Sequence, residues 1–526
     1  MTEDSSKYYE EGKEYLKNGE LDLAIEMFNK ALAINPDDIN SYGNLGIAYS
    51  YKNDYDQAIK IFNKLISLNK DDSLTYYNLA VSYIRYGQPE LAEENLLKTI
   101  ELDPEFLPAY YETADFYYST GDLESSKEYY KKLITLFPQE LEAYHGLAVI
   151  ECSVGEFDCA ISVCEKALSI DPYDFKSINI IGSALSGKGD FDSAIEKYSE
   201  ALKIKPDDSV VLYNMGLAYG DKRDFENARK FYERLAEVDP DYFNVYENLG
   251  DIYFALERFD DSIKAYYRAL LMSPSDVKIL NKIGNSYLVS DELEKALQVY
   301  NQAIEINPKD DIVCNNLGTV YSRLKDFDRA IEWYRKTTFL NPNKVSTNYN
   351  LATLYYTKKN YSQAIKYYEK VITLNPDDLE AMDDLASCYY FLKDYEKALV
   401  LFERLSDYNP SQDRYFYNLG LINLDLGKDI LAIKHFKRTI LINNKNDLAF
   451  FYLGVVYGDR GEFDQAVDHF EKARELNPKK AEIFYLLGIS YAEIGNLEEA
   501  KKNLIQSKLL DSSISNKVDG VLNNLK

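Results

Sequence analysis

The spacing of apolar and polar residues changes twice within a short segment of the chain and then starts again. In residues 413–446, apolar or small residues stand at positions 4, 7 and 8 of the segment and again at positions 20, 24 and 27. Each set has the spacing of one face of an α-helix. Between the two sets, Leu426-Gly427-Lys428-Asp429 combines a helix-stopping glycine with a candidate N-cap, Asp429. The segment therefore predicts a helix–turn–helix unit.

This unit recurs fifteen times at a fixed spacing of 34 residues, beginning at Ser5, without an insertion or deletion. Position 8 is always Gly or Ala, and position 20 is Ala in every repeat except at Ser126 and Ser262. A larger side chain at either position would push the two helices apart. Twelve of the 14 prolines stand at position 32, after the second helix, where proline cannot continue it. Following aspartates, such as Asp38 and Asp378, are candidate N-caps of the next helix. A fixed period of this length indicates one supersecondary unit stacked on copies of itself.

The pattern resembles the tetratricopeptide repeat, with a large apolar residue at position 4, Leu at 7, Gly or Ala at 8, Tyr at 11, Ala at 20, an aromatic residue at 24, Ala at 27 and Pro at 32. The resemblance covers residues 5 to about 512. It implies an all-α fold, a right-handed superhelical solenoid of helix–turn–helix repeats. The departures at position 11 are Glu151, Leu185 and Asn423, and those at position 32 are Lys70, Asn444 and Ser512. They leave open a change of pitch or a soft joint near residues 151–185 and 423–444.

The last residues, 513–526, leave the 34-residue register. Ile514, Val518, Val521 and Leu525 recur there at helical spacing, with polar residues between them. We therefore expect two parts, the fifteen repeats of residues 5–512 and a C-terminal capping helix with a polar outer face.

Composition narrows the function further. The net charge of −27 argues against a nucleic-acid partner, because phosphate binding requires clustered Lys and Arg, and it disfavours adsorption to anionic lipid. No apolar run approaches 18 residues, and the first residues, Met1–Asp4, lack the features of a secretory signal. The five cysteines are odd in number and irregularly placed, which argues against a disulfide framework. We expect a reduced, cytoplasmic protein without membrane insertion.

Two short motifs imitate chemical sites. Residues 182–189 fit the phosphate-binding pattern GxxxxGK, but Gly189 replaces the Ser or Thr that should bind Mg²⁺, and the segment lies in a helix and turn instead of between a strand and a helix. One repeat contains His145, Cys152, Cys159 and Cys164, at a spacing that matches no standard zinc pair. His435, His469 and Trp333 all stand at position 23, beside the core aromatic residue. We predict no catalytic, cofactor-binding or metal-binding residue and no enzyme activity.

One helix face remains for binding. Positions 2, 5, 6, 9, 12 and 13 lie opposite positions 4, 7, 8 and 11 on the first helix. The resemblance implies that these first helices line a concave groove where ligands lie. Position 6 is Asn in seven repeats, at Asn44, Asn78, Asn214, Asn248, Asn316, Asn350 and Asn418. These amides resemble the asparagine ladder of O-linked N-acetylglucosamine transferases, which implies hydrogen bonds to the backbone of an extended peptide. The alternative is a structural role within the repeat.

The last five repeats add aromatic and acidic residues at groove positions. The aromatic residues are Tyr349, Tyr356, Tyr390, Phe391, Tyr417, Phe451 and Tyr485. The acidic residues are Asp383, Asp384, Asp425, Asp459 and Glu493, of which the last three share position 13 in successive repeats. Such a surface suits a segment that carries Lys or Arg together with apolar anchors. The alternative is packing between neighbouring helices with ordinary solvated acids. A carboxylate clamp of the chaperone-tail type is only half present: Asn248, Lys278 and Lys282 match it, whereas Tyr213 and Leu217 replace its Lys and Asn.

These observations favour a non-catalytic scaffold that binds extended or disordered protein segments in its groove, through many weak contacts. Two other classes remain open. One is the substrate-recognition arm or subunit of a glycosyltransferase that acts with a separate catalytic chain. The other is a structural spacer or a co-chaperone.

Overall fold

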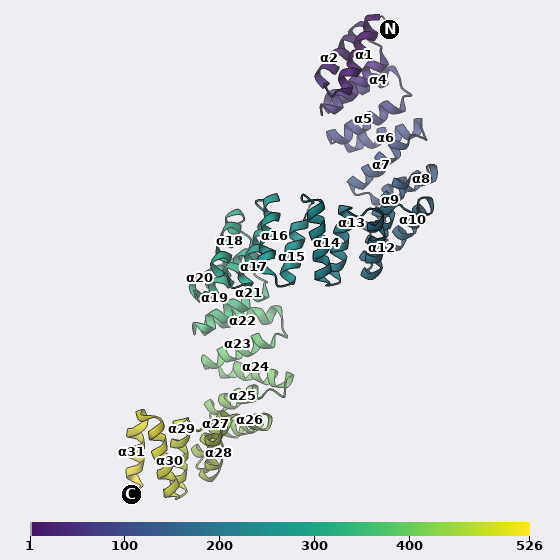
Figure 1. Cartoon of the computed structure of the whole chain (residues 1–526). Helices are drawn as coiled ribbons and strands as arrows, with labels where there is room; N and C mark the ends of the chain where they lie inside the picture. The colour runs from purple at the N-terminus through teal and green to yellow at the C-terminus, as the bar shows by residue number, and fades with distance from the viewer. Residues whose placement is uncertain (1–2, 243, 526) are drawn as a thin grey trace. The chain divides into compact units, whose positions relative to one another are not determined.

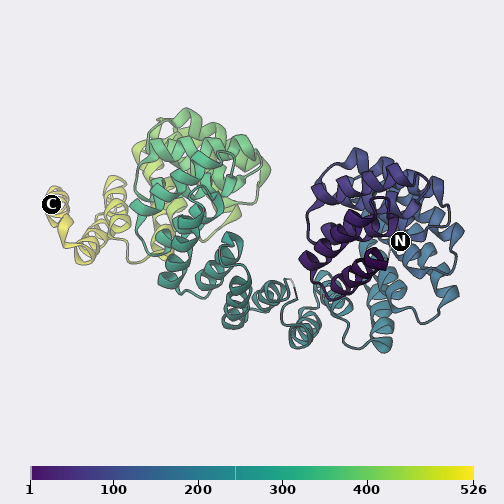
Figure 2. The same ribbon diagram turned by 90° about the horizontal axis from the view of Figure 1, so that it is seen from above.

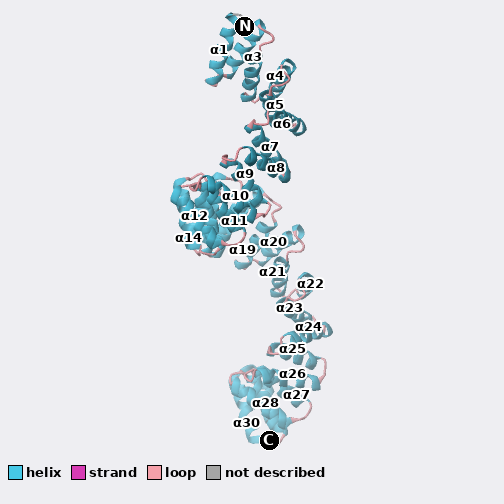
Figure 3. Cartoon of the chain, turned by 90° about the vertical axis from the view of Figure 1, so that its right-hand side faces the viewer, coloured by secondary structure: helices cyan, strands magenta, loops and turns pink. Residues whose placement is uncertain are grey.

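The fold was analysed in a computed structural model that describes residues 3–242 and 244–525. Within this part of the chain every regular element is a helix, and short loops join the helices (Figure 3). The chain divides into two compact units, residues 1–272 and 273–526. Each 34-residue repeat contributes one pair of helices, as the sequence predicts (Figure 1).

The first unit contains repeats 1–8. Within it, successive helix pairs stack along a curved path (Figure 2). The first helices of its repeats are α1 (Glu3–Lys17), α3 (Ile39–Tyr51), α5 (Ser73–Tyr86), α7 (Leu107–Thr120), α9 (Leu141–Ser153), α11 (Phe175–Gly187), α13 (Ser209–Asp221) and α15 (Val245–Ala255). The second helices are α2 (Leu21–Ile34), α4 (Tyr55–Leu68), α6 (Pro89–Leu102), α8 (Leu123–Leu136), α10 (Phe157–Ile170), α12 (Phe191–Ile204), α14 (Phe225–Val238) and α16 (Phe259–Met272).

The second unit contains repeats 9–15 and the C-terminal segment. Its first helices are α17 (Val277–Val289), α19 (Asp311–Arg323), α21 (Val345–Thr357), α23 (Leu379–Phe391), α25 (Asp413–Asp425), α27 (Asp447–Asp459) and α29 (Ala481–Glu493). Its second helices are α18 (Leu293–Ile306), α20 (Phe327–Leu340), α22 (Tyr361–Leu374), α24 (Tyr395–Tyr408), α26 (Asp429–Ile442), α28 (Phe463–Leu476) and α30 (Leu497–Leu510). A 3₁₀ turn, η1 (Ser512–Ile514), and α31 (Ser515–Asn524) follow.

The aromatic residue at position 24 explains why position 8 must be small. These rings are among the largest fully buried side chains of the protein, from Phe28 to Phe470. A Cβ atom built on Gly216 would lie 2.6 Å from the ring of Tyr232, and one on Gly284 would lie 2.4 Å from the ring of Tyr300. The small residue therefore makes room for the ring of the second helix, in addition to letting the two backbones approach.

Position 15 is the turn residue of every repeat, and it adopts the left-handed backbone conformation in all fifteen. Eight repeats place Gly there, such as Gly189 with φ of 81°, whereas the others place residues such as Lys393 with φ of 63°. Glycine adopts this conformation without the steric penalty that a Cβ atom brings. The turn is therefore set by the backbone, and the side chain at this position varies.

Replacing Gly189 by Ala should destabilise its repeat by about 1 kcal/mol. Replacing Lys393 by Gly should instead stabilise its repeat. No heavy atom lies within 4 Å of a Cβ atom built on Gly189, so the effect isolates the backbone. Amide hydrogen exchange in α11 and α12, or in α23 and α24, measures the change locally, because a long repeat array need not unfold in one step. Unchanged protection in both variants would show that the left-handed turn is not strained.

The N-caps agree only in part with the sequence prediction. Asp378 precedes α23, and its side chain accepts a hydrogen bond from the backbone N–H of Ala381 at 3.0 Å. Asp38 stands at the same place before α3, but it bonds to the hydroxyl of Ser41 and to no backbone N–H. The prediction of Asp429 as an N-cap is wrong: Lys428 is the N-cap, and Asp429 is the first residue of α26. An aspartate in the first turn still favours the helix through the helix dipole.

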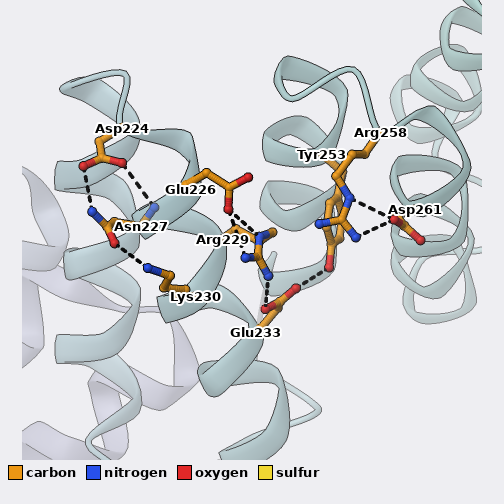
Figure 4. Close-up of polar contacts among 9 residues, drawn as sticks. All are labelled: Asp224, Glu226, Asn227, Arg229, Lys230, Glu233, Tyr253, Arg258 and Asp261. Atoms are coloured by element: carbon orange, nitrogen blue, oxygen red, sulfur yellow. Dashed lines mark hydrogen bonds and ion pairs between the residues drawn. The ribbon is translucent and has the colours of Figure 1, made fainter.

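The tyrosine at position 11 links neighbouring repeats. Tyr253 in α15 donates a hydrogen bond to Glu233 of α14 at 2.5 Å, and the same carboxylate accepts from Arg229 at 2.6 Å (Figure 4). The corresponding pairs Tyr389–Glu369 and Tyr491–Glu471 occur in the second unit at 2.6 and 2.5 Å. In these three repeats the tyrosine thus ties the first helix to the second helix of the repeat before it.

The C-terminal segment packs on the end of the second unit. Val518 of α31 is fully buried, Leu525 packs against the last apolar cluster, and Lys508 of α30 forms an ion pair with Asp519 at 2.8 Å. The segment thus covers part of the last repeat.

Removing residues 513–526 should expose the apolar surface of α30 and promote association of the protein. Val518→Asp should act in the same direction, whereas Asn516→Asp, at an exposed position of the same helix, should not. Light scattering of the three variants distinguishes these results. A monodisperse monomer lacking the segment would show that it is not needed as a cap.

Candidate functional site

The first helices of neighbouring repeats lie side by side and form a common face in each unit. Helices α9 and α11 contact each other directly, as do α17 and α19, and α27 and α29, whereas pairs of second helices make less contact among the described residues. The closer spacing of the first helices makes their side the concave one. Side chains at the predicted groove positions bridge these helices.

Most of the predicted asparagine ladder is engaged within the protein. Asn214 donates to Asn179 of the preceding repeat at 3.0 Å, and Asn316 donates in the same way to Asn281 at 2.7 Å. The amide of Asn316 also donates to Asn285 at 3.0 Å. These bonds join position 6 of one repeat to positions 5 and 9 of the repeat before it. The amides therefore hold neighbouring first helices in register.

Three further ladder residues bond to tyrosine hydroxyls. Asn248 and Asn350 donate to the position-24 tyrosines of the preceding repeats at 3.5 and 3.4 Å, and Asn44 donates to Tyr9 at 3.4 Å. In contrast, the side-chain amides of Asn78 and Asn418 form no hydrogen bond to another described residue. These two amides are the members of the set whose hydrogen-bonding capacity remains open to a ligand.

A hollow of about 250 Å³ lies on the concave face of repeats 11–13. We call it the groove pocket. Its lining residues are Tyr356, Ser387, Tyr390, Phe391, Phe402, Arg414, Asn418 and Leu421. All of them except Phe402 occupy positions 2, 6, 9, 12 or 13 of their repeats. The structure thus brings four residues of the sequence prediction, Tyr356, Tyr390, Phe391 and Asn418, together in one place.

Aromatic rings form one wall of the groove pocket. The ring of Phe391 stacks on Tyr361 with centroids 4.9 Å apart and meets Tyr356 and Tyr390 edge-on at 6.2 and 5.8 Å. Phe391 nevertheless remains 50% exposed. Such an exposed ring, held in place by its neighbours, offers apolar area to a ligand at little entropic cost.

An ion pair between an exposed Arg and a buried Asp lies at the pocket. Asp383 of α23 is 8% exposed, and one of its carboxylate oxygens lies 3.2 Å from a guanidinium nitrogen of Arg414 in α25. The other oxygen, Oδ1, is buried without a hydrogen-bond partner among the described residues. Burial raises the pKa of Asp383, and Arg414 opposes this rise. Arg414 is therefore held at the pocket by Asp383, a carboxylate that the sequence predicts at the groove surface but that is buried.

Two more of the predicted acids orient tyrosines. The Asp384 carboxylate accepts hydrogen bonds from Tyr349 at 3.1 Å and from Tyr368 at 3.0 Å. Burial and a hydrogen bond to Asp425 both raise the pKa of Tyr390. These acids therefore fix the rings that they contact, in addition to contributing negative charge.

The remaining predicted residues follow the groove beyond the pocket. Tyr417 packs against Phe436, with ring centroids 6.0 Å apart. Phe451 is only 3% exposed, and the ammonium of Lys480 lies 3.8 Å from its ring centroid, so this ring is not open to a ligand as it stands. Tyr485 is partly exposed.

The acidic row at position 13 lies at the surface. Asp425, Asp459 and Glu493 are all exposed. Among the described residues, Asp459 and Glu493 form no ion pair. These carboxylates are therefore available to a cationic partner, although solvent weakens each contact.

The residues of the two short motifs make local contacts. Lys188 of the GxxxxGK segment lies 2.5 Å from Asp158, and Gly189 occupies a turn that follows a helix. His145 pairs with Asp174 at 2.5 Å and is not gathered with cysteines in any cluster of the described residues. Cys164 is buried, and this burial raises the pKa of its thiol to about 12. His145 and Cys164 are therefore not gathered with Cys159 in a ligand cluster among the described residues.

Comparison with known proteins agrees with the helix pairs. Family models described as the tetratricopeptide repeat or TPR repeat match residues 12–51, 39–72, 74–106, 107–140, 182–222, 213–277, 290–325, 312–344, 355–419, 448–480 and 481–513. Together they cover well over half of the chain, so the chain belongs to the tetratricopeptide-repeat family. No curated protein matches it. None of the described helices combines the length and apolar character that crossing a membrane requires.

Solved structures resemble the chain only distantly. The Naa15/Naa10 complex bound to HypK-THB shows 13% identity over 98% of this chain and 96% of that chain, with a TM-score of 0.35. The APC/C hetero-tetramer Cut9–Hcn1 shows 16% identity over 91% and 95%, with a TM-score of 0.39. Yeast Tom70 shows 16% identity over 76% and 99%, with a TM-score of 0.34. At such identities and scores, these similarities carry no inference about function.

Proposed function

We propose that the protein is a non-catalytic scaffold and that repeats 11–13 bind an extended segment of another protein on their concave face. The groove pocket carries this proposal. It combines an exposed, pre-oriented ring at Phe391 with the unengaged amide of Asn418. An apolar or aromatic side chain of the partner would fill the pocket, because burial of apolar surface supplies most of the affinity at such anchors.

The groups around the pocket suit a particular partner. The Asn418 amide offers both a donor and an acceptor, which fits the backbone of an extended peptide of any sequence. Arg414 also lines the pocket, and its charge is offset by Asp383. The exposed carboxylates of Asp425, Asp459 and Glu493 favour Lys or Arg beyond the anchor. Contacts of this kind along several repeats would add up through multivalency.

A displayed library of random peptides tests the proposal with the full-length protein. We expect selection of peptides that carry an aromatic or large aliphatic residue near Lys or Arg. Their dissociation constants should rise at least about tenfold in Asn418→Ala and in Tyr390→Ala, which corresponds to roughly 1.4 kcal/mol. Tyr408→Ala removes an equally large ring that is 64% exposed on the second helix α24, and it should leave binding unchanged.

Two results would contradict the proposal. Peptides that bind the two groove variants as tightly as the wild type, or that lose affinity only in Tyr408→Ala, would place the binding surface elsewhere. Circular dichroism of each variant confirms that the helices are retained.

A further inference from the structure

Repeat 5 of the first unit places an acidic residue at position 11, where most repeats have Tyr. This residue, Glu151, faces Lys131 at position 25 of the preceding repeat. A cavity of about 410 Å³ lies between α8, α9 and α10. Its polar lining includes Glu151, Lys131, Lys166 and Cys159.

Glu151 is buried in this cavity without full compensation. The residue is 4% exposed, and its Oε2 atom has no hydrogen-bond partner among the described residues. Burial raises the pKa of this carboxyl; Lys131, Lys127 and Lys166 reduce the rise, and Glu156 adds to it. A buried carboxylate oxygen without a donor is costly, so a cation that reached it would be bound favourably.

Two further ligand groups lie next to this carboxylate. Glu156 is the N-cap of α10, and Cys159 is the third residue of the same helix. One ligand atom from each of Glu151, Glu156 and Cys159 lies within 4.8 Å of the others. A tetrahedral ion holds its ligand atoms roughly 3.3–3.8 Å apart, a spacing that small side-chain rotations reach from this arrangement.

We propose that repeat 5 binds one divalent cation of the zinc class through Glu151, Glu156 and Cys159. One thiolate with two carboxylates suits zinc better than magnesium or calcium, which prefer oxygen ligands alone. Water would complete the tetrahedron. The thiol of Cys159 gives up its proton to solvent as the sulfur–metal bond forms, so one proton is released for each ion bound from the protonated thiol.

Neighbouring groups are compatible with the ion. Lys127, which is almost fully buried, lies 3.3 Å from one oxygen of Glu156, and the other oxygen remains for the metal. Three anionic ligands and one dication leave a single negative charge, which faces the ammonium groups of Lys127, Lys131 and Lys166. The ion would link α9 to α10 across the turn at Gly155, whose φ is 82°. This site lies in the first unit and does not depend on the proposed function of the groove pocket.

Metal titration of the untagged, reduced, full-length protein tests the proposal. We expect one Co²⁺ per chain with a thiolate-to-cobalt charge-transfer band, displaced by Zn²⁺. Cys159→Ser should abolish the band. Glu151→Gln, which keeps the shape of the buried side chain, should weaken Zn²⁺ binding at least about tenfold in calorimetry. Cys152→Ser, a neighbouring thiol outside the cluster, should retain both signals.

Three results would overturn the proposal. The first is a wild-type protein that shows no thiolate band with Co²⁺. The second is a band that survives in Cys159→Ser, and the third is Zn²⁺ affinity that is unchanged in Glu151→Gln. Circular dichroism shows whether the variants keep their helices, so that a loss of metal binding is not confused with unfolding.

Discussion

Replacing Gly216 by Val should destabilise its repeat by about 3 kcal/mol. The Cβ atom alone would lie 2.6 Å from the ring of Tyr232, which is 2% exposed and has no room to retreat. The added methyl groups would force α13 away from α14. The variant should therefore lose amide protection in these two helices first, since each repeat depends on contacts with its nearest neighbours.

Helix α13 supplies its own control for this prediction. Gly220 stands one turn after Gly216 on the same helix, and a Cβ atom there would lie 3.8 Å from Ile252, which is ordinary contact. Gly220→Ala should stabilise the helix by about 0.5–1 kcal/mol, whereas Gly216→Ala should destabilise it. Hydrogen exchange and urea titration of the two alanine variants compare the same chemical change at both sites. Equal effects of the same sign would contradict the packing explanation for position 8.

Replacing Arg414 by Ala should destabilise the second unit by about 2 kcal/mol at neutral pH, because the carboxylate of Asp383 is then buried without a partner. We expect a smaller loss of stability than for a fully buried pair, since the Arg414 side chain is 56% exposed. Adding Asp383→Asn to the Arg414→Ala variant should recover most of the lost stability.

The effect of Arg414→Ala should also depend on pH with a defined sign. Burial raises the pKa of Asp383 in the folded protein, so its folded form favours the proton and loses stability as the pH rises through that pKa. Arg414 limits this loss, and its removal raises the pKa further. The difference between wild type and variant should therefore shrink from pH 7 towards about pH 4, near the ordinary pKa of aspartate. Urea titrations at the two pH values measure it, and a difference that is constant or grows towards low pH would rule out Asp383 as the cause.

The repeating helices can be predicted from the sequence pattern alone. The period of 34 residues and the small residue at position 8 predict helix pairs because each pair must bury the same stripe against its neighbours. The departures at Glu151 and Asn423 leave the lengths of α9 and α25 unchanged from most other first helices. Glu151 instead lines a cavity between α8, α9 and α10.

The candidate site was only partly predictable. Helical periodicity places Tyr390 and Asn418 on the binding face, but it does not show that repeats 11–13 hollow that face into one pocket. The depth of a side chain depends on the stacking of neighbouring repeats, which buries Phe451 and Asp383 at positions expected to be exposed. The partners of Asn214 and Asn316 depend on polar residues 31–35 positions earlier in the chain. Likewise, the ligand atoms of Glu151, Glu156 and Cys159 come close together only because the turn between α9 and α10 folds the two helices side by side.

Photo-cross-linking of a selected peptide to the full-length protein tests the central claim most directly. A photoreactive residue at the anchor position of the peptide records which helix face it touches, and mass spectrometry of the digested product locates the attachment. The groove pocket predicts attachment to α21, α23 and α25, at residues such as Tyr356, Phe391 and Leu421. Attachment confined to second helices such as α22 and α24, or attachment that persists unchanged in Asn418→Ala and Tyr390→Ala, would contradict it.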